Sequence, residues 1–277
     1  MQARLLYRDG LMLVVDKPAG LAVHKGPKGG TSFEDYFDAL RFGLPRKPAL
    51  AHRLDRDTSG CLVLGRHRKA LATLGKLFKR GDVGKTYWAV VEGGPAEDEG
   101  RIDLPLGRLD ETRGWWMKPD PNGQPATTTW RVLGRSISNP SPVGGGPARS
   151  AGVGGEVSLE RATPPGAFSA TLPLQGRDDL TWLALEPITG RTHQLRVHCA
   201  AMGWPVVGDA IYGNAPRSGG PALHLHSREV VVPLYKNRER IKVVAPVPEH
   251  MRTRLKACGW DCVEPASAST LAAHADQ

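Results

Sequence analysis

Residues 51–64, with the sequence AHRLDRDTSGCLVL, join a cluster of charges to a short apolar run. If the first half is extended, alternate side chains share a side, so Arg53, Asp55 and Asp57 are expected to lie together. A carboxylate among cations is favoured in its ionised form, which suits a nucleophile. The apolar run at residues 61–64 is typical of a buried strand. A catalytic loop and an ordinary charged turn share these features, and the charged turn is the commoner of the two.

The segments around this stretch predict mixed β and α structure. Asp9-Gly10 between two apolar runs predicts a β-hairpin, because glycine tolerates a positive φ. A capping-box pattern, Thr31-x-x-Glu34, precedes apolar residues at helical spacing. The predicted helices cover residues 32–42 and 69–79, the second ending at Gly81, and the predicted strands cover residues 86–91, 127–132 and 180–185.

The composition is that of a basic globular protein. Apolar residues make up 40% of 277 residues, which is enough for a sizeable core in one large domain or two small ones. Lysine and arginine number 37 against 28 acidic residues, a net charge of +9. This balance suits a protein that meets phosphates, although a basic protein without a nucleic-acid ligand has it too.

Two segments are expected to lie outside the core. Residues 136–166 are dense in glycine, proline and serine, which predicts a long surface loop or a disordered insertion, with an interdomain linker as the alternative. The tail over residues 265–277 is expected to be disordered. We therefore expect a single domain over residues 1–264.

The sequence gives little support for a disulfide-rich protein, a zinc protein with cysteine ligands or a membrane protein. The four cysteines form no CxxC pair. The longest apolar run near the N-terminus, residues 11–15, is too short for a signal-peptide core or a membrane span. We expect a cytoplasmic protein.

Residues 192–202 predict a helix with one charged residue at the edge of its apolar face. The apolar stripe consists of Thr192, Leu195, Cys199 and Met202. Arg196 lies at the border of this stripe and needs a carboxylate partner, because burying it unpaired is costly. Asp55 is the proposed partner. A surface arginine on an amphipathic helix is the alternative.

Two pairs of histidines raise the hypothesis of a metal site. His193 and His198 are five residues apart, so on a helix their rings point in different directions. His224 and His226 alternate as on one face of a strand. Neither pair has a carboxylate motif such as HExxH, so structural hydrogen bonding or RNA contact is preferred to a metal, and no metal is predicted.

Three strings in order resemble the motifs of RluA-type pseudouridine synthases. They are HRLDRDTSG at residues 52–60, KTYWAVVEG at residues 85–93 and GRTHQLRVH at residues 190–198. Residues 9–27 and 203–213 also resemble family segments, so the likeness runs from about residue 5 to 245. Many relatives carry a small RNA-binding module ahead of the first motif. This chain is expected to be a stand-alone catalytic domain without it.

The resemblance implies a role for each motif. Asp55 matches the essential aspartate of the family, and Arg196 matches the arginine that pairs with it. Tyr87 matches a catalytic tyrosine that stacks on the target uracil and is a candidate for helping to remove a proton from the base, on a strand whose period of two places it with Ala89 and Val91. Arg53 matches an arginine that fills the space left by the extruded base. The further expected RNA contacts are His52, Arg191 and His193.

The same resemblance implies the fold and the reaction. The expected fold is α+β, a mixed and mainly antiparallel sheet with flanking helices and loops around a central basic cleft. The expected reaction converts uridine in transfer RNA or large-subunit ribosomal RNA to pseudouridine, without cofactor, in a monomer that needs no protein partner and no membrane. A non-catalytic RNA-binding protein and a metal-dependent hydrolase that uses the histidines are the alternatives.

Overall fold

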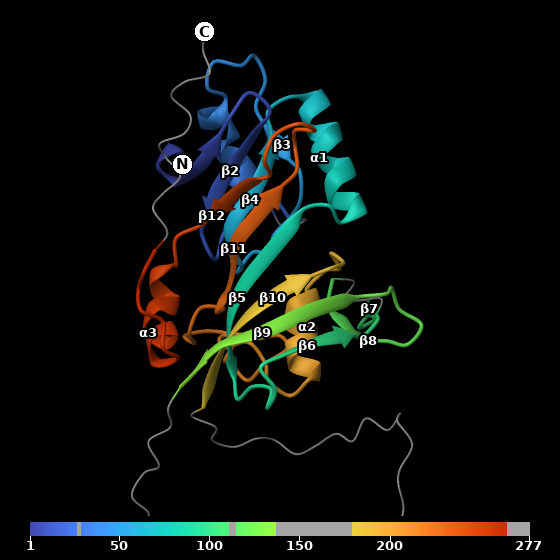
Figure 1. Ribbon diagram of the computed structural model, residues 1–277, viewed down its shortest axis with the longest axis vertical. Helices are drawn as coiled ribbons and strands as arrows, with labels where there is room; N and C mark the ends of the chain where they lie inside the picture. The colour runs from blue at the N-terminus through green and yellow to red at the C-terminus, as the bar shows by residue number, and fades with distance from the viewer. Residues whose placement is uncertain (27–28, 111–114, 137–178, 265–277) are drawn as a thin grey trace, which may run out of the picture.

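A ten-stranded sheet organises the computed structural model, which describes residues 1–26, 29–110, 115–136 and 179–264 (Figure 1). The strands of its main path, in order of pairing, are β1 (Leu5–Arg8), β2 (Met12–Lys17), β4 (Ser59–Gly65), β11 (Leu225–Val232), β5 (Gly84–Glu92), β10 (Leu180–Pro187), β9 (Thr127–Arg135) and β6 (Glu99–Asp103). Strand β3 (Ala49–Leu50) pairs with β4, and β12 (Ile241–Val244) pairs with β11. Among the described residues, every pairing in this sheet is antiparallel except that of β4 with β11. The predicted mixed, mainly antiparallel sheet is confirmed.

The first hairpin forms as the Asp9-Gly10 pair predicts. After the short 3-10 helix η1 (Gln2–Arg4), strands β1 and β2 pair around this turn. Asp9 closes the turn, because its Oδ1 accepts hydrogen bonds of 2.7 Å from the backbone N–H groups of Leu11 and Met12.

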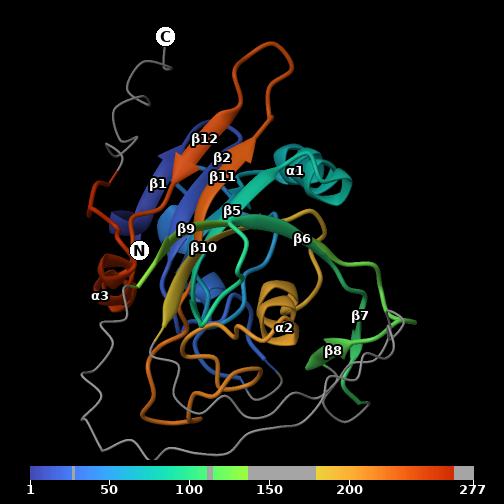
Figure 2. The same ribbon diagram turned by 60° about the horizontal axis from the view of Figure 1, so that its bottom comes forward.

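Helices cover both faces of the sheet. The helical elements that follow η1 are the 3-10 helix η2 (Phe33–Leu40), α1 (Arg68–Arg80), α2 (Gln194–Ala201) and α3 (Glu249–Ala257). Alternation along β4 and β5 divides the apolar side chains between two faces. One face packs against η2 and α2, and the other against α1 and α3, which lie well apart (Figures 1 and 2).

The predicted helices exist, with small corrections. Helix α1 extends one residue beyond the prediction at each end, and Gly81 ends it with a left-handed φ of 79°. The capping box of η2 lies one residue later than predicted: the Ser32 N–H donates to Asp35 Oδ2 at 2.9 Å. The helix predicted over residues 192–202 is shorter in the structure, where α2 spans Gln194–Ala201.

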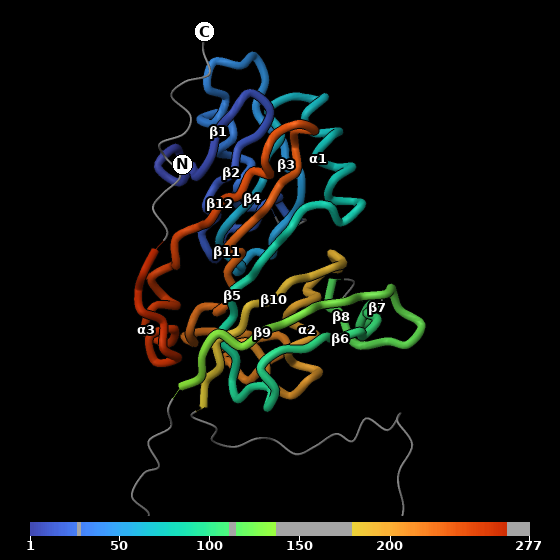
Figure 3. Tube along the Cα trace, viewed as in Figure 1, coloured from blue at the N-terminus to red at the C-terminus, as the bar shows by residue number. Residues whose placement is uncertain are grey.

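Strands β4 and β11 are far apart in sequence but lie side by side (Figure 3). Ser59 and Gly60 pair with His226 and Ser227 in parallel register. Gly60 has a φ of +103°, and a Cβ atom there would lie 2.2 Å from the carbonyl oxygen of Ser227. Glycine is therefore required where this strand begins, directly after the charged loop.

A small second sheet stands beside α2. It consists of β7 (Leu106–Arg108) and β8 (Met117–Pro119) (Figure 2). The predictions for residues 136–166 and for the tail fall almost wholly outside the described residues. Within the described part of the chain, no helix has the length and apolar character needed to cross a bilayer.

Candidate active site

The three motifs meet at one cleft of about 810 Å³. All seven site residues predicted from the sequence line it: His52, Arg53, Asp55, Tyr87, Arg191, His193 and Arg196. Lys79, Arg80 and Lys85 add further cations, and Asp55 is the one carboxylate among the described lining residues. The described lining of the cleft is therefore basic, with Asp55 as its one acid.

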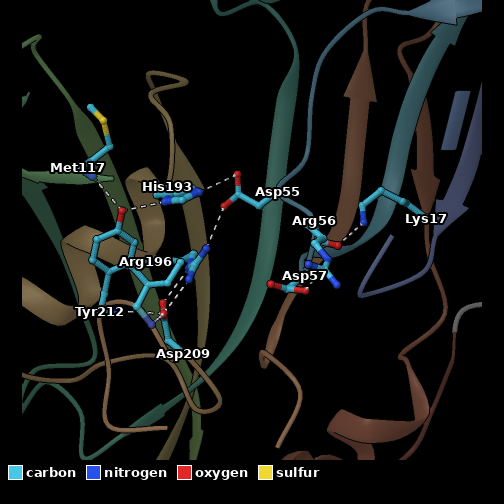
Figure 4. A network of polar contacts seen from close by, with 10 residues as sticks. Lys17, Asp55, Arg56, Asp57, Met117, His193, Arg196, Asp209 and Tyr212 are labelled. Carbon is cyan, nitrogen blue, oxygen red and sulfur yellow. Dashed lines mark hydrogen bonds and ion pairs between the residues drawn. The ribbon is translucent and has the colours of Figure 1, made fainter. Parts of the chain in front are cut away.

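Asp55 lies between β3 and β4 with its carboxylate facing α2 (Figure 4). Its Oδ2 lies 3.7 Å from Nη1 of Arg196, and its Oδ1 lies 3.9 Å from Nε2 of His193. The side chain is 27% exposed, so it is open to a ligand in the cleft. Leu54, which is buried in the core, anchors the loop beside it.

Asp57 does not share the position of Asp55. The chain bends at Arg56 and Asp57, and Asp57 is not among the residues that line the cleft. The prediction that alternation would bring Arg53, Asp55 and Asp57 to one side is therefore wrong for Asp57, because the segment is not extended beyond Asp55.

Arg196 has a stronger partner than the one predicted. Its Nε and Nη2 each donate a 2.7 Å hydrogen bond to the two carboxylate oxygens of Asp209, a bidentate pair (Figure 4). Both side chains are almost fully buried. Asp55 is a second and longer contact of the same guanidinium, made through Nη1. The predicted pairing of Arg196 with Asp55 is present, but Asp209, which the sequence analysis did not identify, is the closer carboxylate partner of the buried arginine.

The charges of this pair stabilise each other. Burial alone would raise the pKa of Asp209, but the hydrogen bonds and charge of Arg196 hold that pKa below its ordinary value. Burial alone would lower the pKa of Arg196, but the hydrogen bonds and charge of Asp209 raise it. Asp209 also accepts the backbone N–H groups of Ile211 and Tyr212 at 2.9 and 3.0 Å. Arg196 is thus a fixed cation beside Asp55.

His193 faces Asp55 from the residue that precedes α2. Its backbone has a φ of 53°, in the left-handed region that non-glycine residues rarely adopt. Nδ1 of His193 lies 2.8 Å from the hydroxyl of Tyr212, which accepts the N–H of Met117 at 2.9 Å (Figure 4). Because the Tyr212 oxygen accepts from Met117, its O–H group can donate a hydrogen bond to Nδ1 of His193. In that tautomer the His193 ring proton is on Nε2, which faces Asp55. Burial is the main reason that the pKa of His193 is lowered.

Tyr87 projects from β5 toward the apolar side that it shares with Ala89 and Val91, as alternation predicts. It is 7% exposed and lines the cleft next to Leu195. Burial raises its pKa well above the ordinary value, and the charge of Asp55 adds to this, against a hydrogen bond with Ser227. Tyr87 is therefore a neutral phenol at neutral pH.

The other predicted residues differ in their surroundings. Arg53 is exposed at the cleft, and Arg191 donates from Nε to the carbonyl of Pro125 at 3.0 Å. His52 uses Nε2 to accept the Val63 N–H at 3.0 Å and stacks on Phe78, and burial lowers its pKa to about 3. One ring nitrogen and one ring face of His52 therefore support the local structure, and its contact with RNA stays a prediction.

Sequence reasoning missed Lys17. This side chain is fully buried, and its Nζ donates 2.8 Å hydrogen bonds to the carbonyls of Pro18, Leu21 and Arg56. It ties the end of β2 to the loop directly after Asp55. Burial lowers the pKa of Lys17 to about 8, although the charges of Asp57 and Asp55 counteract this.

Sequence reasoning also missed three side chains around His193. Asp209 and Tyr212 come from residues 203–213, whose resemblance to the family was seen without a role for either residue. A lone acid within the run VVGDAIYG was the available signal. Trp115 is 57% exposed and meets the His193 ring edge to face, with ring centroids 5.7 Å apart. No periodic pattern marked it.

The histidines proposed as metal ligands have other partners. His198 contacts Thr128 Oγ1 and the Leu104 carbonyl, while His226 contacts Ser59 Oγ. Among the described residues, no group of three or more His, Cys, Asp or Glu side chains could hold a metal ion.

Comparisons with known proteins identify the family. A family model described as RNA pseudouridylate synthase matches residues 11–201. An uncharacterised RNA pseudouridine synthase of Zymomonas mobilis is 35% identical over 248 residues, which cover 89% of this chain and 94% of that protein. The ribosomal large subunit pseudouridine synthase C of Haemophilus ducreyi is 31% identical, over 92% of this chain and 69% of that protein.

A solved structure has the same fold. Human RNA pseudouridylate synthase domain containing 1 superposes with a TM-score of 0.61 and 27% identity, over 88% of this chain and 83% of that one. The family match includes all three motifs that meet at the cleft. The chain therefore belongs to the RluA-type RNA pseudouridine synthases, isomerases that convert uridine in RNA to pseudouridine.

Proposed function

We propose that the chain isomerises specific uridines in structured RNA, and that Asp55 acts on the ribose of a uridine flipped into the cleft. The observation that carries this proposal is the position of Asp55. It is the one carboxylate among the described residues of a basic cleft, and Arg196 and His193 contact its two oxygens. A carboxylate repels phosphate, so a cleft that only bound RNA would have no use for Asp55 at this position.

The chemistry requires an ionised carboxylate at this place. The bond between uracil N1 and ribose C1′ breaks, the base turns, and a bond forms between C5 and C1′. The C5 proton is lost and N1 gains a proton, so no redox change occurs. Asp55 can attack C1′ or remove the C2′ proton, and both steps need the unprotonated oxygen that faces the cleft.

Tyr87 supports the base in this proposal. The Tyr87 ring lines the cleft, and because its pKa is raised the phenol is neutral at neutral pH. A neutral ring is a poor base for the C5 proton and a good stacking surface for uracil. We therefore assign Tyr87 to positioning the flipped base.

Arg53 stabilises the flipped RNA in this proposal. Extruding a nucleotide costs on the order of a few kcal/mol of stacking and pairing. Arg53 is exposed at the cleft, two residues before Asp55, so its planar guanidinium can fill the gap and contact phosphate. Asp55 would then act on the nucleotide that Arg53 displaces.

The substrate we propose is a stem-loop of large-subunit ribosomal RNA or transfer RNA. The relative from Haemophilus ducreyi is named for the large ribosomal subunit. The cations around Asp55 suit a phosphate backbone that enters and leaves the cleft. We also propose that the protein acts in the cytoplasm as a monomer.

The test is to incubate unmodified large-subunit ribosomal RNA and transfer RNA transcripts with purified protein and to map pseudouridine at each position. The wild-type protein should modify a small set of uridines in one of these RNAs. Asp55→Asn should bind that RNA with similar affinity and modify none. Absence of pseudouridine in every RNA treated with folded wild-type protein would refute the proposed substrate class.

A further inference from the structure

Helix α1 carries a stripe of positive charge on its solvent side. Its sequence, RKALATLGKLFKR, contains five cations and no acidic residue. Leu74 and Leu77 turn inward, while Lys69, Lys76 and Arg80 are exposed. At 3.6 residues per turn, these three cations lie within about 40° of one another around the helix axis. They form a line along the outside of α1.

The line begins at the active-site cleft. Lys79, Arg80 and Gly81, at the C-terminal end of α1, are part of the cleft lining. From this end the helix leads away from the cleft for about 20 Å, since it has 13 residues at about 1.5 Å each. A strand of RNA that leaves the cleft on this side meets α1 first.

A second groove lies at the far end of α1. It has a volume of about 410 Å³, and its wall includes Lys69 itself. The exposed cations of this wall are Arg46, Lys47, Arg68 and Lys69, and its described lining contains no acid. The positive surface is therefore continuous from the cleft, along α1, to this groove.

Most of these cations have no ion-pair partner among the residues that the structure describes. Arg80 forms a 2.8 Å ion pair with Asp82. No ion pair within the described part of the chain involves Lys47, Arg68, Lys69 or Lys76. Three cations of α1 and Lys47 in the groove beside it, with no carboxylate partner among the described residues, give a potential that attracts a polyanion.

We propose that α1 and the groove at its N-terminal end bind the sugar–phosphate backbone of the substrate RNA beyond the flipped nucleotide. The proposal rests on the proposed function and names a second contact region for the same RNA. Contacts to phosphate carry no sequence information, so this surface sets affinity and the direction of the RNA, not the choice of uridine. The cleft and Arg53 still select the nucleotide.

The test compares two double variants that remove the same charge. K69Q/K76Q removes two cations from α1 outside the cleft lining. R252Q/K256Q removes two cations from α3, which lies well apart from α1 on the same face of the sheet (Figure 1). Binding is measured for a full stem-loop with flanking strands and for a hairpin trimmed to the target loop, from 50 to 300 mM salt.

The α1 variant should bind the full RNA about tenfold more weakly at low salt, with a salt slope smaller by about 1.5. It should bind the trimmed hairpin like the wild type, and kcat at saturating RNA should not change. R252Q/K256Q should match the wild type throughout, and K69R/K76R should restore binding. Equal affinity of K69Q/K76Q and R252Q/K256Q for the full RNA would overturn the proposal.

The outcome is separable from that of the proposed function. Binding reports on α1 whether or not pseudouridine forms, and pseudouridine mapping reports on Asp55 whether or not α1 matters. Circular dichroism of K69Q/K76Q should show wild-type helix content. If helix content falls, K69R/K76R decides: loss of RNA affinity with both lysines replaced by arginine would contradict a phosphate-binding role.

Discussion

At the scale of single residues, two different carboxylates serve the two roles in the site: Asp209 holds the Arg196 cation, and Asp55 is the proposed reactive group. Asp209 takes both strong hydrogen bonds of Arg196, at 2.7 Å, whereas Asp55 receives only a 3.7 Å contact from the same guanidinium. If Asp55 formed the bidentate pair itself, its oxygens would be occupied. The longer contact orients Asp55 while leaving its oxygens open to the ribose.

Asp209→Asn should weaken both the fold and the reaction. The change leaves the buried charge of Arg196 without its compensating anion, and breaking a buried pair costs about 3–5 kcal/mol. We expect that loss in the free energy of unfolding, measured with urea, and a fall in kcat in the folded fraction.

The control is Asp103→Asn, the same substitution in an exposed pair with Arg101, which should leave the unfolding midpoint unchanged. An Asp209→Asn protein as stable as the wild type would mean that Arg196 does not depend on this carboxylate.

The sequence predicted that Arg196 pairs with Asp55, but not that Asp209 is its closer partner. The ordered motifs predicted that Asp55, Tyr87 and Arg196 belong to one site, and all three line the cleft. The choice of Asp209 over Asp55 depends on how residues 203–213 fold back under α2, and no periodicity encodes that. For the same reason, the sequence did not predict the hydrogen bond from the Val63 N–H to His52.

At the scale of elements, α2 shows why the predicted apolar stripe matches the buried residues of the helix only in part. Every residue from Gln194 to Cys199 is buried, whereas Thr192 and Met202, the predicted ends of the stripe, are exposed. Polar residues on the other side of the helix find partners: Gln194 donates to Thr127 and Thr128, and His198 contacts Thr128. A helix covered on all sides cannot be recognised by an apolar stripe.

Gly60→Ala should destabilise the junction of β4 and β11. The new methyl group would meet the Ser227 carbonyl at 2.2 Å, and the φ of +103° is unfavourable for alanine. Backbone strain and overpacking together cost about 3 kcal/mol or more. Thermal unfolding of Gly60→Ala measures this cost.

Gly75→Ala is the matched control for that prediction. Gly75 lies on the exposed side of α1, where a Cβ meets nothing within 4 Å. This change should stabilise the protein slightly, because alanine favours a helix. Equal melting temperatures for the two variants would contradict the account of the β4–β11 junction.

At the scale of the whole molecule, buried neutral histidines make stability depend on pH. Burial lowers the pKa of His226 and of His52 to about 3, and of His224 to about 4. Their ordinary pKa is about 6.5. Between these values the unfolded chain binds more protons than the folded one, so stability is complete above pH 6.5 and falls as the pH falls.

The unfolding free energy should therefore drop between pH 6.5 and pH 5, by up to about 1.4 kcal/mol per pH unit for each such histidine. His226→Asn should reduce that slope, because His226 is fully buried and contributes its full share. Urea titrations at several pH values provide the measurement. A free energy that is flat from pH 7 to pH 5 would show that these rings bind protons in the folded state as they do in the unfolded chain.

The net charge of +9 also acts at this scale. The positive charge does not cover the molecule evenly, because the cleft, α1 and the groove at its N-terminal end are nearly free of acids among their described residues. The composition suited a phosphate-binding protein but fitted a basic protein without a nucleic-acid ligand as well. Only the fold shows that residue 191 lines the cleft, that residues 46 and 68 line the groove at the far end of α1, and that residue 76 lies on the helix between them.

The most direct measurement is the rate at which tritium leaves C5 of uridine in substrate RNA during a single turnover, since that proton must be lost when C5 bonds to C1′. Asp55→Asn is compared with Asp57→Asn, the same change two residues later on a side chain that does not line the cleft. We predict tritium release at close to the wild-type rate for Asp57→Asn and none above background for Asp55→Asn, although both bind RNA. Release by Asp55→Asn at a rate near that of Asp57→Asn would contradict the assignment of Asp55.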